Sequence, residues 1–153
     1  MKILIMGLPG SGKTWFAKRL QRHLNCAWFN ADDVRRMSND WEFDEEARIR
    51  QSRRMANLAD FEKGCGRPVI CEFVCPTDLT RYIFDADFTI WMDTIEESKY
   101  EDTNKIFEEP KWYDVRFTKW IDQNQLSNYL EDGNHGIEVT QNYLRELMKK
   151  LIK

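Results

Sequence analysis

Residues 7–14 constrain this chain more than any other part of its sequence. They have the pattern G-x-x-x-x-G-K-[ST] and follow the apolar run 2–6, which is typical of a buried strand, while apolar residues recur at helical spacing over 15–24. Glycines between a strand and a helix start let backbone N–H groups surround an anion at the positive end of the helix dipole. The pattern therefore predicts a phosphate-binding loop. It consists of Gly7, Leu8, Pro9, Gly10, Ser11, Gly12, Lys13 and Thr14.

The last two loop residues indicate which ligands the loop holds. Lys13 can reach the β- and γ-phosphates of a nucleoside triphosphate, and the Thr14 hydroxyl can hold Mg²⁺. A chance match in a glycine-rich turn is the weaker interpretation, because strand, loop and helix follow in the required order. ATP and Mg²⁺ are therefore the expected cofactors.

The composition limits the classes of protein to which the chain can belong. At 153 residues it is long enough for one domain with a buried core, and we expect a single domain over 1–153. The net charge of −3 offers no basic surplus for duplex nucleic acid. No apolar run is long enough to span a membrane, and the first one is too short for a signal peptide. We expect a cytoplasmic protein with small-molecule substrates, and homodimer formation stays open.

Strand-like and helix-like segments alternate along the chain, which predicts an α/β fold. The expected class is a three-layer α/β/α P-loop NTPase domain with a mainly parallel five-stranded sheet and right-handed crossovers. Ligands then bind at the carboxyl ends of the strands. The expected strands are 2–6, 26–29, 69–74, 87–93 and 115–118, and the expected later helices are 44–63, 77–84, 96–107 and 137–151.

An acidic segment, Asn30-Ala31-Asp32-Asp33-Val34-Arg35, follows the second expected strand. A carboxylate at Asp32 would point into the cleft over the phosphate loop, where it takes a proton from an attacking hydroxyl or helps to hold the magnesium. Arg35 offers a planar fork to an anionic substrate. An Asp-rich turn is equally typical of a helix cap, so the residues alone leave both interpretations open.

The order of the motifs over roughly residues 1–110 resembles the adenylylsulfate kinases, small P-loop kinases that phosphorylate the 3′-hydroxyl of adenosine 5′-phosphosulfate (APS). Their patterns are the phosphate loop, D-G-D-x-[LIV]-R, G-F followed by R-x-x-N-x-R-R, F-[IV]-S-P with a later arginine, and V-D-T-P followed by the lid R-D-x-K-G-L-Y. The matching segments are 7–14, 30–35, Phe43 with Arg48, Gln51, Arg53 and Arg54, 73–76 with Arg81, 92–95 and 101–107.

The resemblance implies a role for each matching position. It implies that Asp32 is the catalytic base beside Lys13, and that segment 96–110 is a lid over the transferring phosphoryl group. Its substrate-binding residues would be Arg35, Arg48 and Gln51 on the anion and sugar, Phe43 and Phe73 stacked on the adenine, and, in addition, Cys75 and Arg81. The implied pathway is sulfate assimilation.

The sequence also departs from the family pattern. Asn30 replaces the first acid of D-G-D, Gln51 an asparagine and Cys75 a serine; in the lid, Glu101 replaces the arginine and Asn104 stands in place of the lysine. The lid of the family normally supplies positive charge over the transferring phosphoryl group. The loss of that charge weakens the electrostatic stabilisation of the transition state. Two alternatives to an APS kinase therefore remain: a P-loop kinase for another acceptor, such as a nucleoside or a modified base in DNA, and a nucleotide-binding regulatory module without turnover.

Overall fold

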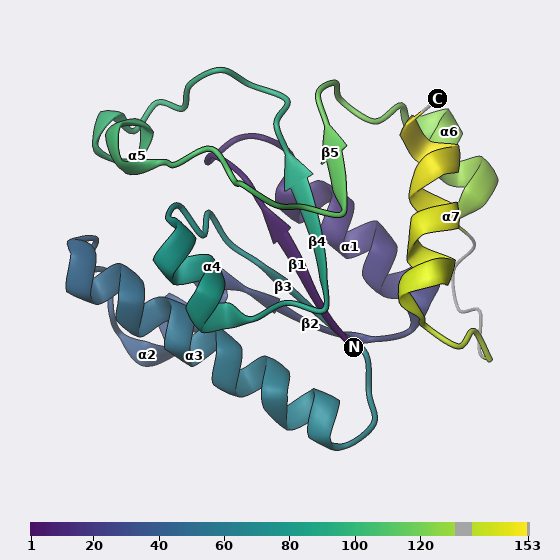
Figure 1. The fold of residues 1–153 in the computed structure, drawn as a ribbon, viewed down its shortest axis with the longest axis horizontal. Coiled ribbons are helices and arrows are strands. Elements are labelled where there is room, and N and C mark those ends of the chain that lie inside the picture. Colours follow the sequence, from purple (N-terminus) through teal and green to yellow (C-terminus); the bar gives the residue numbers. More distant parts are fainter. Residues whose placement is uncertain (131–135, 153) are drawn as a thin grey trace.

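The computed structural model, which describes residues 1–130 and 136–152, is built on a five-stranded sheet in the order β2-β3-β1-β4-β5 (Figure 1). Every neighbouring pair is parallel. The central strands β1 (Lys2–Met6), β3 (Val69–Glu72) and β4 (Phe88–Met92) are buried throughout, while β2 (Ala27–Asn30) and β5 (Val115–Phe117) form the edges. The predicted fold class is confirmed.

Helices cover both faces of this sheet because side chains alternate along its strands. Ile3 and Ile5 of β1 join one core cluster with α1 (Lys13–Leu24), α6 (Gln123–Tyr129) and α7 (Gln141–Ile152). Leu4 and Met6 join the other core cluster. The helices that pack in it are α2 (Ala31–Ser38), α3 (Glu45–Gly64) and α4 (Asp78–Phe84). Among the helices, α5 (Glu101–Ile106) lies apart, at the end of the long connection that follows β4 (Figure 1).

The five expected strands are present, whereas some helices differ from the prediction. The polar helix expected over 96–107 is reduced to α5, because the Asn104 side chain bonds both the backbone and the hydroxyl of Ser98 and so holds residues 98–100 in a loop. The last helix begins at Gln141 instead of residue 137. The prediction did not include α6, which is capped by Asp122.

The acidic segment starts a helix, as the helix-cap interpretation predicts, but the cap is Asn30 and not an aspartate. The Asn30 side-chain oxygen accepts a hydrogen bond from the Asp33 N–H at 3.0 Å and starts α2. The carboxylate of Asp32 is therefore not used for capping and is left for another role.

The carboxyl ends of the parallel strands meet at one edge of the sheet, as in other folds of this class. The phosphate loop follows β1, Asp32 follows β2, and Phe73 follows β3. No helix among the described residues is long and apolar enough to cross a membrane. One domain over 1–153 stays a prediction, since 131–135 and 153 lie outside the described residues.

Candidate active site

The phosphate loop has the backbone geometry that its glycines predict. Gly12 has a φ of 95°, in the left-handed region that favours glycine, and α1 begins at the next residue. At Gly7 a side chain would collide with the carbonyl oxygen of Met92. The hydroxyl of Ser11 is buried in the loop and has no hydrogen-bond partner among the described residues. A concave loop at a helix start with an unsatisfied buried donor is suited to an anionic ligand.

Lys13 holds a desolvated positive charge at the mouth of this loop. Its side chain is only 8% exposed, and its Nζ donates to the carbonyl oxygen of Leu8 at 3.0 Å. Burial lowers the pKa of Lys13 from 10.5 to about 8, an effect that Glu72 and Asp32 oppose. A polyanion in the loop would add negative charge beside Lys13 and offset the cost of its burial.

This lowered pKa predicts a pH-dependent affinity for polyphosphate. A bound polyanion favours the cation and raises the pKa of Lys13 above its value of about 8 in the free protein, so binding takes up a proton above that pH. The affinity for inorganic tripolyphosphate should fall as the pH rises from about 7 to about 9, approaching roughly tenfold per unit at the upper end. Titration calorimetry measures this. A Lys13→Arg variant, always protonated, should show a flatter profile; an equally flat wild-type profile would show that Lys13 does not contact the phosphates.

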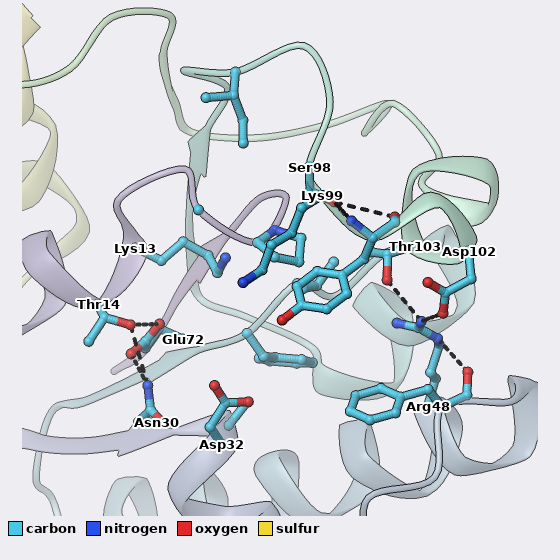
Figure 2. A pocket seen from close by; sticks show the side chains of 18 of the residues that line it. Lys13, Thr14, Asn30, Asp32, Arg48, Glu72, Ser98, Lys99, Asp102 and Thr103 are labelled. Atoms are coloured by element: carbon cyan, nitrogen blue, oxygen red, sulfur yellow. Dashed lines mark hydrogen bonds and ion pairs between the residues drawn. The ribbon is translucent and has the colours of Figure 1, made fainter.

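Glu72, which the sequence analysis did not select, lies directly beside the loop. This last residue of β3 is buried and accepts hydrogen bonds from the Thr14 hydroxyl at 3.1 Å and from the Asn30 amide (Figure 2). Burial raises the pKa of Glu72, while these bonds and Lys13 oppose the rise. A charged residue at the end of a buried apolar strand needs a partner. This rule, applied to the sequence, could have identified Glu72 as a candidate site residue.

The Asp32 carboxylate is exposed and lines the cleft, and it has no hydrogen bond to any described residue. It still contributes to the electrostatic environment of Lys13 and Glu72. The neighbouring Asp33 is different, because its carboxylate pairs with Arg36 at 3.0 Å and it does not line the cleft. Of the two aspartates, Asp32 is therefore the one available to a ligand.

These groups line a cleft of about 890 Å³ between the phosphate loop, α2, α3 and segment 96–110. In Figure 2, Lys13 and Lys99 reach toward the open middle of the cleft from different sides, and Asp32 points into it from the start of α2. The cleft brings together a subset of the predicted site residues: Pro9, Gly10, Lys13, Thr14, Asp32, Phe43, Arg48 and Phe73.

Arg35, Gln51 and Cys75 instead line a small adjoining cavity of about 70 Å³. The Arg35 guanidinium is buried and donates to the carbonyl oxygens of Asp40 and Glu42, at 3.1 and 2.9 Å. The Gln51 amide donates to the Ala31 carbonyl oxygen at 3.1 Å. All three residues thus lie beside the main cleft and not in it, and Arg35 already has partners for its guanidinium.

Cys75 is buried, and burial raises the pKa of its thiol to about 12, which favours the neutral thiol. Arg81 lies outside both cavities. Its guanidinium donates to the carbonyl oxygens of Cys75, Pro76 and Glu108 and pairs with Asp78. Arg81 therefore connects the segment after β3 to the segment after α5, and these bonds stabilise the structure there.

The two phenylalanines expected to enclose an adenine differ in exposure. Phe73 is only 6% exposed and packs edge-on against Phe84, with ring centroids 5.5 Å apart. Phe43 is 47% exposed, and the guanidiniums of Arg35 and Arg48 lie 4.4 and 5.6 Å from its ring centroid. Both rings line the cleft, but only Phe43 offers a large stacking surface.

Segment 96–110 closes the far side of the cleft. Arg48 of α3 donates to Thr103 at 3.1 Å and to Asp102 at 3.4 Å, and thereby joins this segment to α3 (Figure 2). Asn104, at the position where the resemblance places a lysine, bonds within the segment. The positive charge that this segment adds to the cleft comes from Lys99.

The sheet order, the phosphate loop and the cleft together define a three-layer α/β/α P-loop NTPase fold. The family model described as an AAA domain matches residues 3–111, so the chain belongs to that family. No curated protein sequence matches the chain.

Solved structures with this fold include several kinases. The APS kinase CysC of Mycobacterium tuberculosis, in complex with AMPPNP and APS, is 19% identical with a TM-score of 0.67, covering 99% of this chain and 97% of that one. A hexameric APS kinase from Thiobacillus denitrificans is 18% identical with a TM-score of 0.65. The match covers 99% of this chain and 29% of that one. Shikimate kinase from Aquifex aeolicus is 16% identical with a TM-score of 0.55. The match covers 76% of this chain and 85% of that one. The resemblance to APS kinases is thus confirmed at the level of the fold.

Proposed function

We propose that this protein is an ATP-dependent kinase that transfers the γ-phosphoryl group to a hydroxyl of a small anionic nucleotide, with the 3′-hydroxyl of APS as the first candidate. The observation that carries the proposal is that the Lys13 ammonium and the Asp32 carboxylate, which has no hydrogen bond to any described residue, line one cleft from two successive strand-to-helix junctions of the chain. Phosphoryl transfer needs this pair: a cation at the transferring group and a base at the attacking hydroxyl.

Each residue has a distinct part in the reaction. The N–H groups of loop 7–14 hold the phosphates, and Lys13 neutralises the charge that develops on them. The acceptor oxygen bonds to the γ-phosphorus as the bond from that phosphorus to the ADP oxygen breaks. The hydroxyl proton passes to the Asp32 carboxylate. Positioning and electrostatics, rather than covalent chemistry by the protein, account for the rate.

The oxygen donors around Thr14 fit a magnesium ion. The Thr14 hydroxyl and the Glu72 carboxylate are hydrogen-bonded to each other, and Asp32 lines the same cleft. Mg²⁺ takes oxygen ligands and usually binds through one or two carboxylates plus phosphates and water. The described residues contain no group of three His, Cys, Asp or Glu side chains that could hold a metal, and Mg²⁺ does not need one here. When bound, it supplies positive charge to the triphosphate.

Glu72→Gln should raise the Mg²⁺ concentration needed for half-maximal turnover by roughly 10–100-fold, as loss of a supporting carboxylate does in other metal sites. Glutamine keeps the shape of Glu72 but removes the negative charge beside Thr14. Steady-state rates over a Mg²⁺ titration measure this effect. Glu97→Gln is the matched control, because Glu97 is an exposed acid of the same cleft without a bond to Thr14. An unchanged Mg²⁺ requirement in Glu72→Gln would remove Glu72 from the metal site.

The acceptor is best identified by a screen with radiolabelled ATP against APS, nucleosides, nucleotides and DNA with modified bases. Phe43 and Arg48, which the resemblance assigns to the APS adenine and anion, line the cleft and support APS. Label transfer to APS alone is the expected result. Transfer to another acceptor would keep the kinase and replace its substrate.

One observation favours a less anionic acceptor as the second candidate. Arg35 and Arg81 do not line the cleft, which leaves Arg48 and Lys99 as its cations on the proposed acceptor side. The acidic residues Glu97 and Asp102 line the same cleft. A nucleoside, which carries no phosphate, suits that balance of charge. ATP binding without transfer to any acceptor would instead indicate a regulatory module.

A further inference from the structure

Trp120 is an exposed aromatic residue that rests on the phosphate loop. It lies between β5 and α6, and 58% of its surface is accessible to solvent. A Cβ atom on Gly12 would lie 2.6 Å from its Cζ3 atom, so the indole contacts the bare backbone of that glycine. The loop therefore has a large flat side chain directly beside it.

Trp120 follows the edge strand β5, and this separates it from the side of the sheet where Asp32 lies. The strand order places β1, which leads into the phosphate loop, in the middle, with β2 at one edge and β5 at the other (Figure 1). Asp32 follows β2, whereas Trp120 follows β5. No described residue after Thr103 lines the cleft that contains Asp32. A triphosphate in the loop thus has the acceptor on one side and Trp120 on the other.

We propose that Trp120 stacks on the base of the donor nucleotide, an inference that rests on the kinase function proposed above. With the γ-phosphate turned toward Asp32, the α-phosphate and nucleoside extend toward the β5 edge, where the indole is exposed. Stacking of a base on an aromatic side chain contributes about 1–3 kcal/mol. Contact with Gly12 holds the indole in place before binding, which limits the entropy lost on stacking.

The experiment compares ATP with inorganic tripolyphosphate, which has no base, by titration calorimetry. Trp120→Ala should weaken ATP binding by roughly 5- to 150-fold and leave tripolyphosphate binding unchanged. Trp120→Leu, which keeps bulk against Gly12 but no ring, should behave like alanine, whereas Trp120→Phe should retain most of the ATP affinity. Trp112→Ala is the matched control, because Trp112 is 60% exposed and does not line the cleft.

Two results would overturn the proposal. If Trp120→Ala weakens both ligands equally, Trp120 supports the loop and does not contact the base. If it changes neither, the base lies elsewhere. In both cases the proposed kinase function stands, provided that the wild-type protein binds ATP and tripolyphosphate. If the wild-type protein binds neither ligand, the kinase function fails, and this proposal fails with it.

Discussion

Lys13→Ala is expected to reduce phosphoryl transfer by at least about 10²–10³-fold, the loss typical of removing one group that stabilises transition-state charge. Lys13 is the loop residue whose side chain brings a positive charge to the phosphates. Because burial penalises this cation in the free protein, its removal should not lower the melting temperature. Initial rates with saturating ATP, together with thermal unfolding followed by circular dichroism, measure both effects.

Lys18→Ala is the control for Lys13→Ala. Lys18 lies on the same helix, is exposed and does not line the cleft, so its variant should keep the wild-type rate. A Lys13→Ala protein with normal melting and a near-normal rate would contradict the assignment of residues 7–14 as the phosphate site.

Asp32→Asn is expected to lower kcat by about 10²–10⁴-fold, the usual contribution of a positioned base, with little change in ATP affinity. Asparagine keeps the shape of the side chain at the start of α2 but cannot take up the hydroxyl proton. Turnover with the identified acceptor and ATP binding by calorimetry separate the two effects.

Asp33→Asn provides the comparison within the same turn. The Asp33 carboxylate pairs with Arg36 and does not line the cleft, so this variant should turn over normally. A loss of less than about tenfold in Asp32→Asn would be too small for a general base and would show that Asp32 has another role.

The fold could be predicted because its signals are local in the sequence. Short apolar runs, a glycine-rich loop and polar residues at strand ends each define an element within a few residues. The end of β1, the loop and the start of α1 needed no information from distant residues. The prediction failed where a distant or competing side chain decides the structure, as at Asn104, whose bonds to Ser98 shorten α5.

The candidate site was predictable only in part, for the same physical reason. Glu72 acquires its role from Thr14, which is 58 positions away in the chain, and Trp120 from its contact with Gly12. Arg35 has the residue type expected for anion binding, yet its guanidinium bonds carbonyl oxygens of the following loop. A sequence shows which groups a side chain can bind, but not which partner the fold brings to it.

If Arg48 binds the acceptor as proposed, its bond to Asp102 gives the protein an internal competitor for that acceptor. An acceptor anion that reaches the Arg48 guanidinium must displace a carboxylate already beside it at 3.4 Å. The same guanidinium also holds Thr103 and the Phe43 carbonyl oxygen, so the exchange loosens segment 96–110 from α3. By reciprocity, anything that pulls this segment away from α3 makes Arg48 available and strengthens acceptor binding by the same factor. Under this proposal, acceptor affinity would report how firmly the contacts of Arg48 hold segment 96–110 against α3.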